Sequence, residues 1–435
     1  MLSMSLRLIF CLTTRMAAKD ILNGYTTRNN KDIFNKNKVL EVNLKKILTG
    51  IYTCDIDVGT PKQKIQVAFD TGSSDSWVWL LDSDVCQSER KKCQDSQSYF
   101  FNSSASLSLH SLNESFDVVY HAAEVKGEWQ MDTLALGNAK LSQMRFGSVT
   151  SAKLLSPGFG VIGLGLKPFE STYTSEYGLD YRFPNTQVPS EHKYVYDNFP
   201  VTLQKSQVIE KNCFSVYYPS NDNSSNVFLF GGVDTTKYDN LTTLPIIEKI
   251  SGKVISFDRP TMLAVELSQM YLKNEKMQSG LQKLNYPALL DTLTYTTIAP
   301  EEFVNTLASS LKGNYFSQDN GTGIVFKCAN NHDYDLLFDF QGSTLQMHLL
   351  DFSEREGDTC FLPVEKNKDR FIVLGSQFLS KFYTFFDLER LEISVGQLIG
   401  SSKESDITAV KSQERPFNSA SAKNFSKIFN FRPNN

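Results

Sequence analysis

The segment Val67–Ser74 reads VAFDTGSS, a short apolar run that ends on the carboxylate of Asp70, followed by threonine and glycine. The segment Ala288–Tyr295 reads ALLDTLTY and repeats this arrangement around Asp291, with Leu293 in place of the glycine. Each pattern is typical of a buried strand that delivers a carboxylate to a turn. If the two turns meet, the like charges cannot both ionise, so one carboxyl group keeps its proton. The sequence therefore predicts an acid and a base at one site, as hydrolysis by an activated water requires.

A second pair of matching segments supports this doubling. Val-Ile-Gly at 161–163 follows the first motif, with its glycine 93 residues after Asp70. Val-Leu-Gly at 373–375 follows the second motif, with its glycine 84 residues after Asp291. Such an internal repeat predicts a pseudo-symmetric protein of two lobes with its site between them.

Composition excludes several classes of protein. The chain has 435 residues, enough for two lobes, and its net charge of −4 gives no basis for binding nucleic acid. It contains no run of 18 apolar residues and no closely spaced set of histidines and cysteines. We therefore expect no metal, no cofactor, no membrane anchor and no nucleic-acid partner.

Periodicity divides the rest of the chain. Short runs rich in Val, Ile, Tyr, Phe and Thr, separated by Gly, Asn, Asp and Ser, predict mostly β-structure. The best candidate for a helix is 301–311, which begins with two acidic residues. We predict an N-terminal lobe at 49–234, a C-terminal lobe at 235–399 and a disordered polar tail at 400–435.

The N-terminus and the glycosylation motifs favour the secretory route. Residues 1–19 contain a short apolar run and predict a signal peptide, with a disordered leader or a later start codon as the alternatives. Residues 20–48 predict a short prosegment, in which Lys45 and Lys46 are either a maturation site or a solvated pair. We expect a secreted or cell-wall location, with the vacuole as the alternative. The candidate N-glycosylation sites are Asn102, Asn113, Asn223, Asn240, Asn320 and Asn424.

The cysteines fit an oxidising compartment. Cys86 and Cys93 close a short polar loop, and Cys328 and Cys360 could clip a segment rich in hairpins. We predict these two disulfides, although spacing alone does not fix the connectivity. Cys54 and Cys213 are then either buried thiols or members of another pairing.

These motifs resemble those of the pepsin-family aspartic proteases, especially the fungal secreted, candidapepsin-like and yapsin-like members. The segment Asp70–Ser74 with Trp77 matches the first family motif, and 371–375 with 386–388 resembles the closing segment. Residues 198–200, 214–217 and 230–234 also match stretches typical of the fungal enzymes. The resemblance covers about residues 50–398 and implies a mostly β, bilobal fold with a cleft and a hairpin flap over it.

The resemblance also implies an activity and a set of site residues. It implies a monomeric endopeptidase that cleaves polypeptides at acidic pH, in which Asp70 and Asp291 share a proton and activate a water. Tyr120 is implied as the flap tyrosine, supported by Trp77. The residues implied to support the pair of carboxylates are Thr71, Gly72, Ser73, Thr292 and Thr294.

The chain departs from the family pattern in three places, two near Asp291 and one at the flap tip. Leu293 replaces a glycine, Tyr295 replaces a small residue, and Ala122 and Ala123 stand at a flap tip that usually contains glycine. Leucine at 293 predicts a twisted loop or a filled subsite, and the flap tip should be stiffer. The alternative function is therefore a catalytically impaired relative that binds peptides or proteins. A fault in the sequence around 291–296 would also explain the departure.

Overall fold

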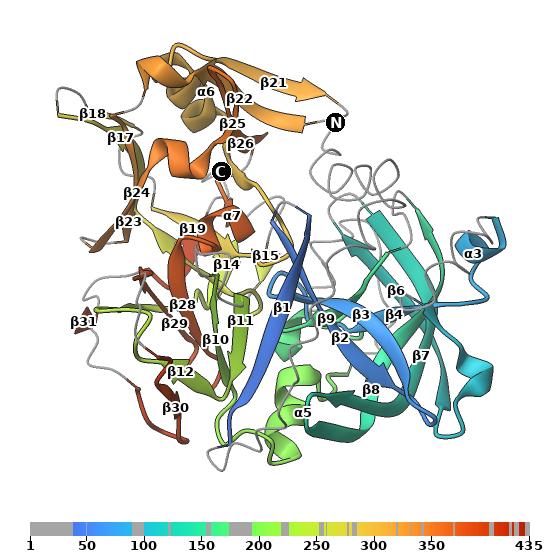
Figure 1. Cartoon of the computed structure of the whole chain (residues 1–435). Coiled ribbons are helices and arrows are strands. Elements are labelled where there is room, and N and C mark those ends of the chain that lie inside the picture. The colour runs from blue at the N-terminus through green and yellow to red at the C-terminus, as the bar shows by residue number, and fades with distance from the viewer. Residues whose placement is uncertain are drawn as a thin grey trace.

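The computed structural model has two lobes joined by a shared β-sheet, as Figure 1 shows. The mostly β, bilobal fold predicted from the sequence is confirmed. The structure describes residues 38–48, 50–88, 100–120, 123–153, 158–173, 194–218, 226–251, 256–257, 259–275, 278–280, 285–318, 321–331, 333–340, 343–368, 370–399, 404–416, 420–421 and 426–430.

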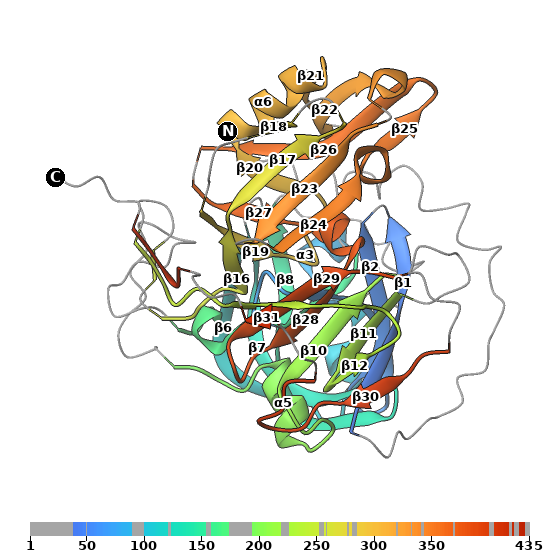
Figure 2. The same ribbon diagram turned by 90° about the vertical axis from the view of Figure 1, so that its left-hand side faces the viewer.

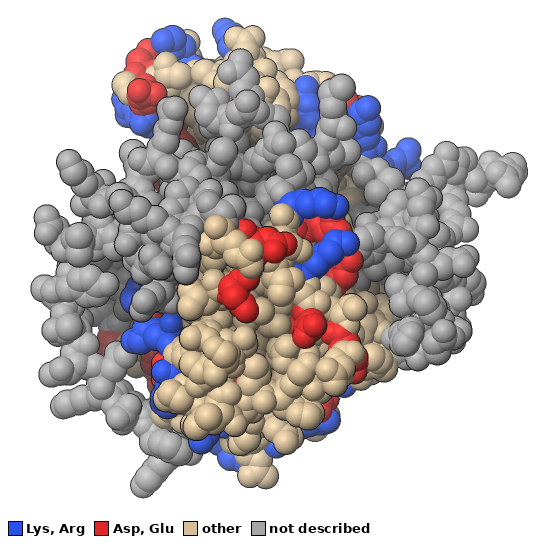
Figure 3. Space-filling view, turned by 90° about the vertical axis from the view of Figure 1, so that its right-hand side faces the viewer, with Lys and Arg blue, Asp and Glu red and all other residues tan. Residues whose placement is uncertain are grey.

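Long antiparallel strands form the N-terminal lobe. Its elements are β1 (Leu40–Leu48), β2 (Ile51–Val58), β3 (Gln63–Asp70), β4 (Trp77–Leu80), α3 (Asp84–Ser88), β5 (Phe100–Phe101), η2 (Ser103–Ala105), β6 (His110–Tyr120), β7 (Ala123–Leu136), β8 (Ala139–Lys153), β9 (Gly160–Gly163), η3 (Lys167–Phe169) and α5 (Phe199–Lys205). β6 and β7 form a hairpin whose pairing continues to Tyr120 and Ala123. Figure 3 shows the side of the molecule that lies on the right in Figure 1, where acidic and basic side chains lie among many uncharged residues.

The shared sheet is buried on both faces. It includes β10 (Cys213–Tyr217), β11 (Asn226–Phe230), β13 (Thr242–Pro245), β28 (Phe382–Asp387) and β29 (Glu392–Gln397), and it continues through β1 into the N-terminal lobe. β12 (Gly232–Asp234) follows β11 directly in the chain. Phe214 and Phe386 face the large core that continues into both lobes, whereas Tyr217 and Tyr383 belong to a separate cluster on the opposite face. A strand between two cores has no polar face, which explains the nearly continuous apolar sequences of β10 and β28.

The described part of the C-terminal lobe contains three smaller sheets and the predicted helix. Its elements are β14 (Lys249–Ser251), β15 (Ser256–Phe257), β16 (Ala264–Leu267), β17 (Gln269–Lys273), β18 (Gln278–Gly280), β19 (Tyr286–Leu290), β20 (Thr297–Pro300), α6 (Glu301–Ser310), β21 (Asn314–Gln318), β22 (Gly321–Lys327), η5 (Cys328–Asn330), β23 (Asp335–Phe340), β24 (Ser343–His348), η6 (Leu349–Phe352), β25 (Glu354–Glu356), β26 (Thr359–Asn367), β27 (Ile372–Leu374) and α7 (Ser376–Leu379). α6 buries Phe303, Val304 and Leu307 on one face, which explains why the periodicity identified it.

The two lobes repeat one local arrangement. β3 runs parallel to β9, so Asp70 lies opposite Gly163 in the sheet. β19 runs parallel to β27 in the same way, and the amide of Asp291 donates to the carbonyl of Leu374. Each apolar-apolar-glycine segment found in the sequence is therefore the strand beside a carboxylate-bearing strand.

One predicted boundary differs at the N-terminus. Residues 40–48 were assigned to the prosegment, but they form β1, which pairs with β11 and β2 inside the body of the protein. Leu40, Val42 and Leu44 are buried in the large core, so this strand is part of the lobe. Lys45 and Lys46 lie within this paired strand, and Lys45 forms an ion pair with Asp55. The predicted signal peptide lies outside the described residues.

The prediction of a disordered tail is wrong for much of residues 404–430. β30 (Ile407–Ala409) pairs with β12, β31 (Ala420–Ser421) with β13, and β32 (Ile428–Asn430) with β14. Figure 2 shows β30 beside β12. Val410 and Phe429 are buried in two different cores. The sequence did not reveal these strands because their few apolar residues are separated by polar ones and form no periodic pattern.

Candidate active site

The turns after β3 and β19 bring the two predicted carboxylates together where the lobes meet. Asp70 is 3% exposed and Asp291 is 9% exposed, and their carboxyl groups are hydrogen-bonded to each other. A Cβ atom on Gly72 would lie 2.7 Å from the Asp291 carboxyl carbon. Glycine is therefore required at 72, because any side chain there would displace the opposite carboxylate.

Two threonines connect the turns symmetrically. The Thr71 hydroxyl donates to the carbonyl of Leu290 at 2.7 Å, and the Thr292 hydroxyl donates to the carbonyl of Phe69 at 2.7 Å. The amide of each threonine also donates to the hydroxyl of the other, at 3.1 Å from Thr71 and 2.9 Å from Thr292. These crossed bonds are buried, so they hold the two carboxylate-bearing turns in one relative position.

The two carboxylates receive different sets of donors. Asp70 accepts from the Gly72 amide at 2.8 Å and from the Ser73 hydroxyl at 2.5 Å. Asp291 accepts from the Leu293 amide at 2.9 Å, and from the amide and hydroxyl of Thr294 at 3.1 Å and 2.6 Å. Asp291 thus has one more backbone donor than Asp70 among the described residues, and hydrogen-bond donors in general stabilise a charged carboxylate.

Burial acts on Asp70 in the opposite direction. The pKa of Asp70 is raised to about 8 by loss of solvent and, to a smaller extent, by repulsion from Asp291, against the hydrogen bonds from Ser73 and Gly72. A carboxyl group with this pKa is protonated in acid solution. The pair can therefore present a proton donor and a proton acceptor side by side.

Tyr120 stands at the end of the β6–β7 hairpin, and its hydroxyl accepts a hydrogen bond from the indole nitrogen of Trp77 at 2.6 Å. The rings are 6.5 Å apart between centroids. The structure thus joins the two residues implied for the flap. The flap tip was predicted to be stiff at residues 121–123. Ala123 is the first paired residue of β7, whereas His121 and Ala122 lie outside the described residues.

Leu293 fits its turn without the distortion that the sequence suggested. It is not among the described residues with positive φ, and its amide makes the same bond to Asp291 that the Gly72 amide makes to Asp70. Its partly buried side chain packs against a cluster in the N-terminal lobe. The prediction of a twisted loop is therefore wrong, because the backbone geometry at 293 is open to any residue.

Tyr295, the second substituted position, contacts both lobes. Its hydroxyl donates to Glu354 at 2.9 Å, and its ring occupies the space where a Cβ atom of Gly50 would lie. Ser376 donates its hydroxyl to the carbonyl of Gly50 and its amide to the carbonyl of Thr294. Sequence analysis missed Gly50, Glu354 and Ser376, although a lone glycine between two strands is a signal of a constrained turn.

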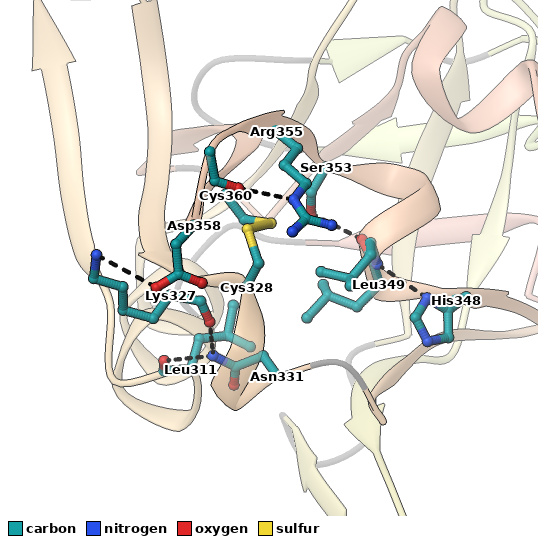
Figure 4. Close-up of a disulfide and its surroundings, with 12 residues drawn as sticks. Leu311, Lys327, Cys328, Asn331, His348, Leu349, Ser353, Arg355, Asp358 and Cys360 are labelled. Carbon is teal, nitrogen blue, oxygen red and sulfur yellow. Dashed lines mark hydrogen bonds and ion pairs between the residues drawn. A yellow bond between two sulfur atoms is a disulfide. The ribbon is translucent and has the colours of Figure 1, made fainter.

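The disulfide between Cys328 and Cys360 is present, with Cα atoms 5.2 Å apart (Figure 4). It connects the start of η5 to β26, and beside it the Asn331 side chain donates to the Lys327 carbonyl at 2.9 Å. Cys86 is also disulfide-bonded, and its predicted partner Cys93 lies outside the described residues. Cys54 and Cys213 are buried free thiols.

The remaining predicted sites lie apart from the paired carboxylates. Asn113 and Asn240 are exposed and Asn102 is partly buried. The other glycosylation candidates, Asn223, Asn320 and Asn424, lie outside the described residues. The described residues contain no group of three or more His, Cys, Asp or Glu side chains that could hold a metal ion. None of their helices is long and apolar enough to cross a membrane.

Comparison with known proteins agrees with this geometry. The model of the eukaryotic aspartyl protease family matches residues 51–398, which include both carboxylates. The chain belongs to this family. Membership makes it an aspartic-type endopeptidase by class and confirms the predicted pepsin-family resemblance.

Individual fungal relatives of this aspartyl protease share about a third of its sequence or less. An acid protease of Saccharomycopsis fibuligera is 30% identical, over 80% of this chain and 81% of its own length. Aspartic proteinase yapsin-3 of Saccharomyces cerevisiae is 28% identical, over 83% of this chain and 69% of its own length. Secreted aspartic protease 8 of Candida albicans is 30% identical, over 80% of this chain and 76% of its own length.

Proposed function

We propose that this protein hydrolyses internal peptide bonds of polypeptides in acid, with Asp70 as the general acid and Asp291 as the general base. The observation that supports these roles is the unequal set of donors on the two carboxylates. Three donors stabilise the charge of Asp291, whereas Asp70 has two and is more deeply buried.

The reaction follows from that division. A water between the carboxylates gives a proton to Asp291 as its oxygen attacks the peptide carbonyl carbon. Asp70 donates its proton to the carbonyl oxygen, which gives a tetrahedral diol. Asp291 then passes the proton to the amide nitrogen, the C–N bond breaks, and Asp70 recovers a proton from the diol. No covalent intermediate with the protein forms, and both carboxylates return to their starting states.

Tyr120 and Trp77 would help to hold the bound peptide substrate. The hydrogen bond between them fixes the tyrosine hydroxyl at the end of the hairpin. A hairpin that closes over a bound peptide excludes water and holds the scissile bond in place. We propose a secreted or cell-wall location and a monomer, with the vacuole as the alternative compartment, because the relatives include a secreted aspartic protease.

Cleavage of denatured casein between pH 3 and pH 7 tests the function. Wild type, Asp70→Asn and Leu293→Gly would be compared, each with and without a peptidomimetic that mimics the tetrahedral diol. We expect a bell-shaped pH profile for wild type, loss of cleavage in Asp70→Asn, and a change of less than about tenfold in Leu293→Gly, because the bond from residue 293 is a backbone bond.

The alternative function is peptide binding without cleavage. The feature that favours it is the Leu293 side chain, which lies partly exposed beside the carboxylates. Cleavage by Leu293→Gly with none by wild type would support the binding role. Absence of cleavage in both proteins, with the peptidomimetic still bound, would refute the proposed acid–base pair.

A further inference from the structure

We propose that Tyr295 is a positioning residue for the second catalytic loop, which it fixes between the β1–β2 turn of the N-terminal lobe and β25 of the C-terminal lobe. The inference rests on the proposed function, because the loop that Tyr295 would hold carries the general base Asp291. Tyr295 itself lies four residues beyond Asp291 in the chain.

The ring of Tyr295 lies directly against the backbone of Gly50. A Cβ atom on Gly50 would be 1.9 Å from Cδ2 and 2.7 Å from Cε2 of this ring, so only glycine allows the contact. Gly50 also has a φ of +73°, a conformation that favours glycine. The turn and the tyrosine therefore fit one another across the boundary between the lobes.

Polar bonds hold the same loop at three further points. The Tyr295 hydroxyl donates to Glu354 at 2.9 Å, and its carbonyl accepts from the Gln377 amide at 3.1 Å. The preceding carbonyl, of Thr294, accepts from the Ser376 amide at 2.7 Å. Thr294 donates two bonds to Asp291 and is joined directly to Tyr295 in the chain. A displacement of Tyr295 would therefore move two of the donors that hold the general base.

Among the described residues, the first catalytic loop has no such contact with the opposite lobe at this position. Its matching residue is Ser74, which is fully buried and donates its hydroxyl to the carbonyl of Leu166 at 2.7 Å in the same lobe. Tyr295 and Leu293 instead pack against the cluster of the N-terminal lobe that contains Trp77. The position of Asp291 therefore depends on how the second catalytic loop packs against the N-terminal lobe. The side chains of Leu293 and Tyr295 form that contact.

The kinetic test uses Tyr295→Ser and Tyr295→Phe in the full chain. We expect Tyr295→Ser to lower kcat by about 10- to 100-fold with little change in KM, because a small displacement of the base slows the chemical step more than it weakens binding. The two limbs of the pH profile of kcat should also shift, because a changed distance between the two carboxylates changes how strongly they share a proton. Tyr295→Phe, which loses only the bond to Glu354, should fall between Tyr295→Ser and wild type.

Tyr315→Phe is the matched control. Tyr315 is also a partly buried tyrosine of the C-terminal lobe, and its hydroxyl accepts a bond from the Lys366 amide, away from the catalytic loop. Its removal should leave the pH profile of kcat unchanged. Equal effects of Tyr315→Phe and Tyr295→Phe, or an unaltered pH profile in Tyr295→Ser, would overturn the positioning role.

A second measurement separates this inference from the proposed function. Urea unfolding of Gly50→Ala, Tyr295→Ser and the double variant, all carrying Asp70→Asn, needs no cleavage. Alanine at 50 should destabilise the protein clearly less when residue 295 is serine, because the ring that it strikes is gone. If the two substitutions are coupled and the protein with Asp70 intact cleaves no casein, the proposed function is refuted and the contact is retained. Strictly additive effects would refute the contact.

Discussion

Stability against pH should depend strongly on Glu170, the residue after η3. Its side chain is 0% exposed, one carboxyl oxygen accepts the Tyr196 amide at 2.8 Å, and the other has no partner among the described residues. The pKa of Glu170 is raised from 4.5 to about 9, mainly by burial and also by the nearby Asp75, against the hydrogen bond from Tyr196 and the charges of Lys167 and Arg145. Glu170→Gln keeps the bond from Tyr196 and removes the titration.

The sign of the effect follows from proton binding. Between pH 4.5 and pH 9 the folded protein keeps a proton on Glu170 that the unfolded chain releases. The stabilisation is therefore complete below about pH 4.5 and is lost as the pH rises toward 9. The loss is at most about 1.4 kcal/mol per pH unit, so Glu170 alone should remove about 4 kcal/mol between about pH 4.5 and 7.5.

The assay is urea unfolding followed by tryptophan fluorescence at pH 4.5, 6 and 7.5. All proteins would carry Asp291→Asn, which prevents self-cleavage and contributes equally to each. Between pH 4.5 and 7.5 the unfolding free energy of the parent should fall by about 4 kcal/mol more than that of Glu170→Gln. Glu210 is exposed, so Glu210→Gln should show the same pH dependence as the parent. Parallel pH curves for the parent and Glu170→Gln would refute the reasoning.

Three other variants test separate parts of the structure. Trp77→Phe removes the donor to Tyr120, so kcat/KM for casein should fall about 5- to 10-fold; an unchanged value would mean that the bond does not matter for the flap. Lys211→Met leaves the buried Asp387 without the cation that lies 2.5 Å away, so the free energy of unfolding in urea should fall by about 3–5 kcal/mol. A fall of less than about 1 kcal/mol would contradict this prediction. Truncation after residue 403 removes the buried Val410 and β30, and should lower the unfolding free energy by at least about 2 kcal/mol, whereas equal stability would mean that the tail only rests on the surface.

The sequence predicted more about the residues of the site than about the boundaries of the lobes and the tail. The crossed threonines, the donors at 73 and 294, and the pairing of Trp77 with Tyr120 all lie where the family resemblance placed them. These positions follow the local order of a motif, in which a carboxylate and its neighbours occupy one turn. The strands of the tail did not emerge from the sequence because an edge strand needs only a partner strand, and that partner lies far away in the chain.

The sequence by itself determined that two strands end on carboxylates, because the apolar runs and the Asp-Thr pairs are local patterns. It also determined the family, since the first motif is long and specific. Only the tertiary structure decided that Leu293 needs no positive φ, that Gly50 and Tyr295 fit together, and that Asp291 has the extra donor. Each of these depends on φ angles and on distances between segments far apart in the chain, which no single segment encodes.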